Sequence, residues 1–293
     1  MITEPASPPA AVSDLRTHND RILDLLSPFM VATRDQLAFA DPAPFGLATR
    51  WHIDPCLQGN QVFFELLQRL DALTFGPEGM PMDKWVFYNC AELPGFIYGF
   101  ALPVEALTAT ERELMFVPPD YQGPVPFSMY IAIPMREAGA WFGHNLASLN
   151  RTFPDRRLNH LGTITKAIAL KAFRARVFVG ATQWESSALH IHTKFGPLDL
   201  QTTWTPAHSF PATLTYAFAV TDRCMRAAAG DPDVAIERPP ADLWLDAEDE
   251  ATMRRLQSEI EAGARFSLVG PPSAQAGRVK HPIQCLAGRP ATA

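Results

Sequence analysis

The sequence predicts an α+β protein with a mixed, mostly antiparallel sheet flanked by helices, an extra N-terminal helix and a C-terminal helical tail. Stretches with helical spacing of apolar residues alternate with short runs of β-branched and aromatic residues. Tight turns join the early runs, so the early strands should be antiparallel, whereas a later strand–helix–strand stretch needs a crossover. The 293 residues are 47% hydrophobic, with 19 Phe and 6 Trp, which is enough to bury a large core.

Two helices and a hairpin are expected in the first hundred residues. The first helix begins at Asp14, and the second covers Gln58–Phe75, where apolar residues recur every three or four positions until a Gly-Pro pair. Trp85–Ala91 and Phe96–Leu102 are rich in aromatic and β-branched residues and flank a Leu-Pro-Gly turn. We therefore expect these two runs to pair as strands.

The later elements follow from the same periodicities. Phe127–Ile133 predicts a third strand ended by proline, and Thr163–Phe173 predicts an apolar helix that Thr163 can cap. Arg176–Thr182 then predicts the strand that the crossover reaches. The remaining expected elements are helices over Thr108–Leu114, Gly139–Asn150 and Asp246–Ala262, and strands over Leu198–Trp204 and Thr213–Val220.

Composition divides the chain into three parts. Residues 1–12 are rich in Pro and Ala and are expected to be disordered, residues 13–226 form the main domain, and residues 227–293 are expected to form a linker, a charged helix and a mobile tail. The N-terminus lacks the pattern of a secretory signal, and the four cysteines form no close pair. These features predict a cytoplasmic protein with reduced thiols.

Charge and motif content exclude several functions. The formal net charge is −6 and no Lys/Arg run follows a phosphate backbone, so no nucleic-acid partner is expected. No apolar stretch is long enough to predict a membrane span. The sequence has no nucleophile elbow, P-loop or dinucleotide-binding glycine motif. His190-x-His192 lacks a third ligand nearby, so no metal site is expected, and Cys90 is expected to be an inert thiol.

The order of the predicted elements is similar to that of the GCN5-related N-acyltransferase fold, and one motif adds to the resemblance. The family has a short helix with the pattern A-x-x-[LI]-Y-x-K-x-G-F, and Ala188–Pro197 has the same spacing. His192 stands where the family has Tyr, and Pro197 stands where it has Phe. The resemblance covers roughly the middle 160 residues.

The resemblance implies an acyl-CoA, or an acyl-carrier protein, as the donor and an amine of a small molecule as the acceptor. In this fold the pyrophosphate of CoA lies on the N–H groups of a helix N-terminus, after a loop of pattern R/Q-x-x-G-x-G/A. Two segments fit in part. One follows Ile133 and contains Arg136 and Gly139, and the other contains Gly162 and Thr163 at a helix start.

Amine acylation needs a base for the amine proton and an acid for the departing thiolate. By position in the motif, His192 is the candidate acid. Glu92, at the end of a predicted strand, and His144, among aromatic residues, are the other candidate catalytic groups. The residues expected to line a substrate pocket for a hydrophobic acyl chain or an aromatic substrate are Tyr98, Trp141, Trp204 and His208.

Two alternatives remain open at this stage. One is a non-catalytic protein that binds a ligand or partner on the same scaffold. The other is a small-molecule lyase or hydrolase that uses the His/Trp-lined pocket without CoA. The sequence also leaves open a homodimer and the role of the C-terminal part.

Overall fold

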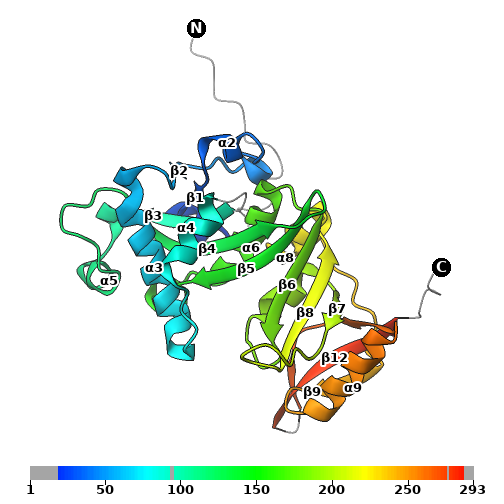
Figure 1. Cartoon of the computed structure of the whole chain (residues 1–293). Coiled ribbons are helices and arrows are strands. Elements are labelled where there is room, and N and C mark those ends of the chain that lie inside the picture. The colour runs from blue at the N-terminus through cyan, green and yellow to red at the C-terminus, as the bar shows by residue number, and fades with distance from the viewer. Residues whose placement is uncertain (1–18, 93–95, 276, 287–293) are drawn as a thin grey trace.

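The computed structural model describes residues 19–92, 96–275 and 277–286. Within these residues, twelve strands form one sheet in the order β11-β12-β10-β7-β8-β6-β5-β4-β3-β1-β2, with β9 paired to β12 (Figure 1). The strands are β1 Ser27–Val31, β2 Trp51–Ile53, β3 Phe96–Pro103, β4 Pro124–Pro134, β5 Ala140–Ser148, β6 Val177–Gln183, β7 Leu198–Thr202, β8 Thr213–Ala219, β9 Leu243–Asp246, β10 Arg265–Leu268, β11 Ser273–Gln275 and β12 Arg278–Leu286.

Most neighbouring strands are antiparallel, as expected for an α+β protein. The parallel pairs among the described strands are β1 with β2 and β5 with β6. The β5–β6 pair arises because a helix, α6, connects the two strands and returns the chain to the same edge. The predicted class, a mostly antiparallel sheet flanked by helices, is therefore confirmed.

Helices cover both faces of the central strands. The helices are α2 Arg34–Leu37, α3 Gln61–Phe75, α4 Lys84–Glu92, α5 Ala109–Leu114, α6 Leu161–Ala172, α7 Leu189–His192, α8 Asp222–Ala228 and α9 Glu250–Glu261. Asn145 of β5 hydrogen-bonds Asp71 of α3, whereas Ser128 of β4 hydrogen-bonds Thr165 of α6. Because side chains alternate along a strand, α3 and α6 lie on opposite faces.

Two predicted elements are wrong. Residues 85–91 lie in helix α4 rather than in a strand, with Phe87 fully buried and Trp85 exposed. The aromatic run suits either element, and packing decides for the helix, because Phe87 enters the core and Tyr88 stacks on Phe64 of α3 with ring centroids 4.7 Å apart. Residues 140–148 form strand β5 rather than a helix, since pairing with both β4 and β6 supplies their backbone partners. The expected Leu-Pro-Gly turn lies outside the described residues.

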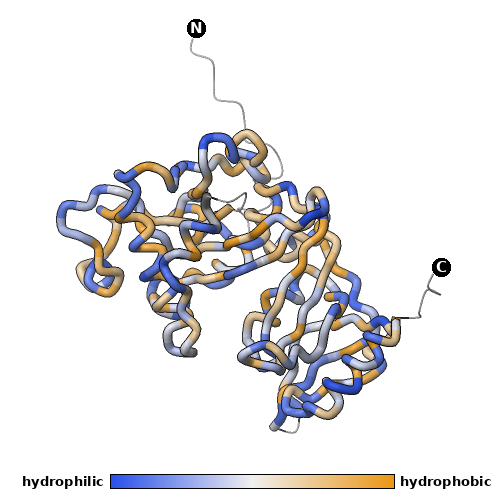
Figure 2. Tube along the Cα trace, in the orientation of Figure 1, coloured by the Kyte–Doolittle hydropathy of each residue, from blue (hydrophilic) through white to orange (hydrophobic). Residues whose placement is uncertain are grey.

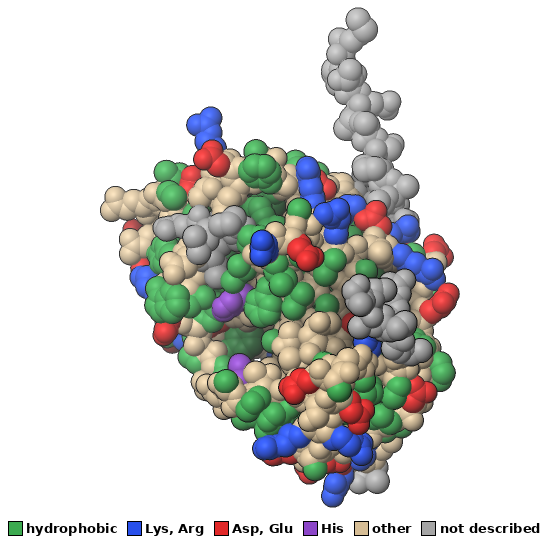
Figure 3. All heavy atoms as spheres, turned by 45° about the vertical axis from the view of Figure 1, so that its right-hand side comes forward, with side chains coloured by type: hydrophobic (Ala, Val, Ile, Leu, Met, Phe, Trp, Pro, Cys, Tyr) green, Lys and Arg blue, Asp and Glu red, His purple; other side chains and the backbone are tan. Residues whose placement is uncertain are grey.

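The segment after residue 227 contains the predicted charged helix, α9, but its last part is not the expected mobile tail. Strands β10 and β12 extend the sheet beyond β7, and β12 also pairs with β9. Asp246 forms ion pairs with Lys280 and Arg278 across the β9–β12 edge. Charged side chains gather at this end of the molecule, at the bottom of Figure 3.

The buried hydrophobic side chains of the strands and of the helices that cover them form one core cluster. Hydrophobic segments run through the central strands, and hydrophilic segments lie mainly in outer helices and loops (Figure 2). Polar groups are also buried within this core, among them Lys166, His192 and Asp71. In the part of the chain that the structure describes, no helix is long and apolar enough to cross a membrane.

Candidate functional site

Strands β5 and β6 start together and then separate, and this opening defines the candidate site. They pair only from Ala140↔Val177 to Gly143↔Gly180. Beyond these glycines β5 continues to Ser148 while β6 remains paired to β8 (Figure 1). Residues 144–148 therefore present one edge of backbone N–H and C=O groups without a neighbouring strand. Such an edge can pair with an extended, amide-containing ligand.

Glycine is required on both strands where they separate. A Cβ on Gly143 would overlap the Tyr130 hydroxyl and the Phe178 ring, and a Cβ on Gly180 would lie 2.6 Å from the Tyr216 hydroxyl. Both tyrosines are buried. The closed end of the opening is thus filled, on the α6 face, by two tyrosine side chains that lie against backbone.

The wide end of the opening faces the N-terminus of α6. The N–H groups of Gly162 and Thr163 have no hydrogen-bond partner among the described residues, while that of Ile164 bonds His160. His160 is the N-cap and has φ 69°, a left-handed conformation that favours glycine. Free N–H groups and the dipole of a twelve-residue helix together favour an anion at this point.

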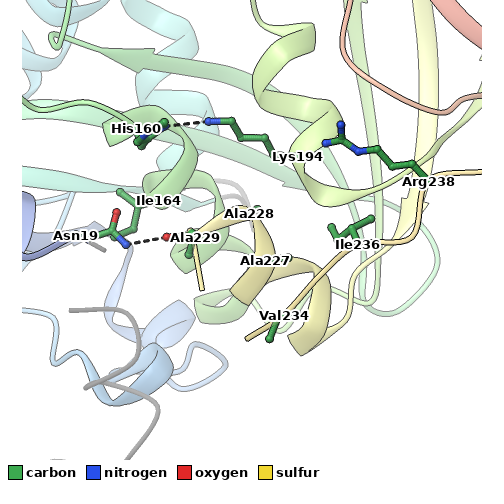
Figure 4. Close-up of a pocket in the computed structure, with 11 residues that line it drawn as sticks. Asn19, His160, Ile164, Lys194, Ala227, Ala228, Ala229, Val234, Ile236 and Arg238 are labelled. Atoms are coloured by element: carbon green, nitrogen blue, oxygen red, sulfur yellow. Dashed lines mark hydrogen bonds between the residues drawn. The ribbon is translucent and has the colours of Figure 1, made fainter. Parts of the chain in front are cut away.

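A cavity of about 450 Å³ lies beside the same helix start (Figure 4). Its basic residues are His160, Lys194 and Arg238, and Lys194 Nζ lies 2.9 Å from His160 Nδ1. Lys194 Nζ also lies 3.5 Å from the Thr163 hydroxyl. Burial lowers the pKa of Lys194, and burial together with Lys194 lowers the pKa of His160. A bound anion would relieve the repulsion between these groups.

The opposite face of the sheet carries a second polar group. The register of β4 and β5 shifts between Ile131 and Ala132, which leaves His144 as the extra residue of a β-bulge. The adjacent Asn145 donates to Asp71 Oδ1 at 2.6 Å, and the N–H of Met82 donates to Asp71 Oδ2 at 2.6 Å. Asp71 is buried, and burial raises its pKa.

His144 is the first residue of β5 past the paired stretch. Its side chain reaches solvent, yet the surrounding protein desolvates the charged form and lowers the pKa of the imidazole. A neutral imidazole at this point is able to accept a proton near pH 7. The bulge thus brings a candidate base to the edge of the opening.

His192, the candidate acid, lies in the core. Its Nδ1 is 3.0 Å from Nζ of Lys166, and both side chains are buried. Burial and then Lys166 lower the pKa of His192 well below its usual value. The imidazole is therefore neutral, and its ring packs 5.4 Å from that of Tyr216, centroid to centroid. Glu92 ends helix α4 instead of a hairpin strand.

The two segments proposed for the pyrophosphate lie at opposite ends of β5. Gly162 and Thr163 are in the first turn of α6, beside the opening. Ile133, Arg136 and Gly139 belong to the β4–β5 hairpin, where the N–H of Met135 bonds Ala140. The nine residues of β5 separate the two ends by roughly 30 Å. The hairpin is at the closed end, so the structure does not bring these three residues to the helix start.

The four expected pocket residues do not line one pocket: two of them meet at one buried ring, and the other two lie elsewhere. Tyr98 is fully buried on β3 and lies edge-on to Phe173, and Trp141 packs on the same ring. Trp204 is covered by the guanidinium of Arg254 from α9, 4.4 Å from the ring centroid. His208 is exposed in the β7–β8 loop, where its Nδ1 accepts from the Phe210 N–H. None of the four lines the opening between β5 and β6.

Two features of the site had signals in the sequence that were missed. Asp71 is a carboxylate on the apolar face of its helix, four residues after Leu67. Arg157–Gly162 fits the family loop except that His160 replaces its first glycine, and the left-handed φ of His160 explains the match. The third feature, the paired tyrosines, depends on strand register and had no local signal.

Comparison with known proteins was made at the levels of sequence and fold. No protein-family model matches the sequence, and no curated protein matches it. Several solved structures match. That of aminoglycoside 6'-acetyltransferase type Ii is 14% identical, with a TM-score of 0.36 over 56% of this chain and 93% of that one.

Two further solved structures match with similar scores. The NatC complex bound to Gag peptide and CoA is 14% identical, with a TM-score of 0.40 over 57% of this chain and 96% of that one. The AHL synthase LasI is 11% identical, with a TM-score of 0.33 over 61% of this chain and 92% of that one. Identities and TM-scores this low assign neither a family nor an activity to the chain, so the case for an activity rests on the site.

Proposed function

We propose that this protein is an acyltransferase that moves an acyl group from an acyl-CoA to the amine of a small molecule. The observation that carries the proposal is the alignment of three features along one path. An anion site at the start of α6 leads into the free edge of β5, and that edge ends at a bulge that carries His144. Acyl-CoA has the matching order of groups, namely phosphates, an amide-containing arm and a thioester.

The residues fit this donor. The N–H groups of Gly162 and Thr163 would hold the pyrophosphate. Lys194 and Arg238, in the cavity beside them, would contact further phosphate oxygens. The pantetheine amides would pair with the edge at residues 144–148, and this places the thioester toward Gly143 and Gly180. The second donor considered, an acyl-carrier protein, has no nucleotide for the basic cavity.

Chemistry at the closed end follows from these positions. The amine nitrogen attacks the thioester carbonyl, and the carbon–sulfur bond breaks with its electrons on sulfur. His144, held neutral by its surroundings, takes the proton of the attacking amine. Asp71 does not reach solvent, and both of its oxygens accept hydrogen bonds. Its role is to position Asn145 and the segment at Met82 on the acceptor side.

Thermal unfolding with acetyl-CoA and with a long-chain acyl-CoA tests the proposal. A donor at about 100 times its dissociation constant should stabilise the folded state by about 2.7 kcal/mol. Lys194→Gln, which removes a charge from the cavity, should weaken both donors, whereas Lys84→Gln, an exposed charge at the start of α4, should not. Stabilisation without any acyl transfer to a panel of amines would favour the non-catalytic binding protein. Absence of stabilisation by either donor would contradict the proposal.

A further inference from the structure

The cavity beside the start of α6 is lined by basic groups, although the protein as a whole has a formal net charge of −6. Its basic side chains are His160, Lys194 and Arg238, and no carboxylate is among the described residues that line it. Cations gathered in one cavity repel each other, and a bound anion relieves that repulsion. The cavity is thus suited to a ligand that carries several negative charges.

The basic groups lie at two different places in the cavity. Lys194 Nζ is 3.5 Å from the Thr163 hydroxyl and 2.9 Å from His160 Nδ1, so Lys194 belongs to the anion site at the start of α6. Arg238 lies instead beside the end of α7, where its Nη2 is 3.5 Å from the backbone oxygen of Thr193. In Figure 4, Lys194 points toward His160, and Arg238 points toward the segment that carries Lys194. The cavity therefore offers a second cation next to the first anion site.

One wall of the cavity is apolar. Small and aliphatic side chains form it, namely those of Ile164, Ala227, Ala228, Ala229, Val234 and Ile236. Asn19 Nδ2 donates to the backbone oxygen of Ala229 at 2.7 Å, and Arg223 Nη2 donates to that of Ala235 at 2.9 Å. These bonds fix the segment that follows α8 at two points. An apolar wall that is held in place is suited to the face of a purine ring.

CoA has its charges and its base in a matching arrangement. Its pyrophosphate joins the pantetheine arm to the ribose, and the ribose carries a separate 3′-phosphate next to adenine. With the pyrophosphate at the start of α6 and the pantetheine arm along β5, the nucleotide lies in the cavity. The 3′-phosphate is the group that distinguishes CoA from 3′-dephospho-CoA.

We propose that Arg238 binds the 3′-phosphate of the donor, so that the segment between α8 and β9 selects CoA esters over donors that lack this phosphate. The proposal rests on the proposed function and adds a determinant of donor choice to it. A guanidinium binds phosphate through charge-assisted hydrogen bonds that are often bidentate. Arg238 is exposed, and solvent screens part of this interaction, so the expected preference is about tenfold.

Calorimetric titration with CoA and with 3′-dephospho-CoA tests the proposal. Wild type should bind CoA about tenfold more tightly than 3′-dephospho-CoA. Arg238→Gln should weaken the binding of CoA about tenfold and leave that of 3′-dephospho-CoA unchanged, so that the two ligands become equivalent. Lys194→Gln should weaken the binding of both by the same factor, because both contain the pyrophosphate.

Arg174→Gln is the matched control for overall charge. Arg174 is also exposed, and it follows the C-terminal end of α6, a helix roughly 18 Å long whose other end carries the anion site. This variant should keep the wild-type preference for CoA. Arg238→Gln without ligand should retain the wild-type unfolding temperature, because the substituted side chain is exposed.

The outcomes separate the two proposals. Equal binding of the two ligands by wild type would overturn the inference and leave the proposed function standing. A preference that persists in Arg238→Gln would also overturn it, because another group would then bind the 3′-phosphate. Loss of the preference in Arg174→Gln as well would overturn it, because the effect would then follow from overall charge. Failure of wild type to bind either ligand would overturn the proposed function and the inference with it.

Discussion

Replacement of Lys166 by methionine should abolish a pH dependence of folding stability. Lys166 is fully buried in the middle of α6, with Nζ 4.0 Å from the Phe178 ring centroid and 3.0 Å from His192 Nδ1. No carboxylate in the described part of the chain pairs with it. Burial is the main cause that lowers its pKa well below the usual value.

The magnitude follows from proton linkage. Unfolding returns Lys166 to a pKa of about 10.4. Between the folded and unfolded pKa values, the unfolded chain binds one proton that the folded chain does not. The free energy of unfolding therefore rises by about 1.4 kcal/mol per pH unit in that interval, and this contribution disappears in Lys166→Met. The buried cluster of aromatic rings accommodates methionine without a large change of volume.

Urea unfolding followed by tryptophan fluorescence measures the effect. Wild type and Lys166→Met are compared at values about one unit apart between roughly pH 7 and pH 9. The stability of wild type relative to the variant should increase at each step. A constant difference across the range would show that Lys166 keeps its proton in the folded protein, and it would refute the reasoning that His192 and Lys166 are both neutral.

Three further changes test other parts of the structure. Asp71→Asn places an amide against two donors and should lower the free energy of unfolding by about 2 kcal/mol in urea titrations, and a change near zero would contradict the bonding at Asp71. Burial opposes ionisation of Glu111, but hydrogen bonds from Arg156 outweigh it and lower the pKa, so this carboxylate stabilises the fold above its unfolded pKa. Glu111→Gln should therefore cost about 1–3 kcal/mol at pH 7, with the difference from wild type shrinking below about pH 4 and an unchanged difference arguing against the ion pair. Deletion of residues 273–293 removes β12, the partner of β9 and β10, and should lower the unfolding temperature by many degrees in calorimetry, whereas retention of the wild-type value would contradict the pairing.

Much of the fold could be predicted because many helices and strands have a clear periodicity of apolar residues along the chain. The apolar stripe of α3 and the buried run of α6 are confirmed, and so are strands β3, β4, β6, β7 and β8. The strand order could then be matched to a known fold. The strand predicted over residues 85–91 is wrong because aromatic and β-branched residues favour a strand locally, whereas the contacts of Phe87 with the core and of Tyr88 with Phe64 favour a helix.

The candidate site was harder to predict than the fold, because its geometry depends on how β4, β5 and β6 are aligned with one another. Gly162 and Thr163 could be predicted to lie at a helix start, and the structure has them in the first turn of α6. The hairpin with Arg136 and Gly139 also matches part of the family's glycine loop. The sequence does not reveal that this hairpin and the start of α6 lie at opposite ends of β5. The approach of Tyr130 to Gly143 involves strands that pair with a bulge, which no spacing along the chain reveals.

The measurement that tests the central claim most directly is hydrogen–deuterium exchange with and without acetyl-CoA. The account predicts that the donor slows exchange at residues 144–148 and at the first turn of α6, because these backbone groups gain partners. Exchange in the β4–β5 hairpin at residues 135–139 should not change. Protection of that hairpin instead, or no protection at the start of α6, would contradict the proposed path of the donor.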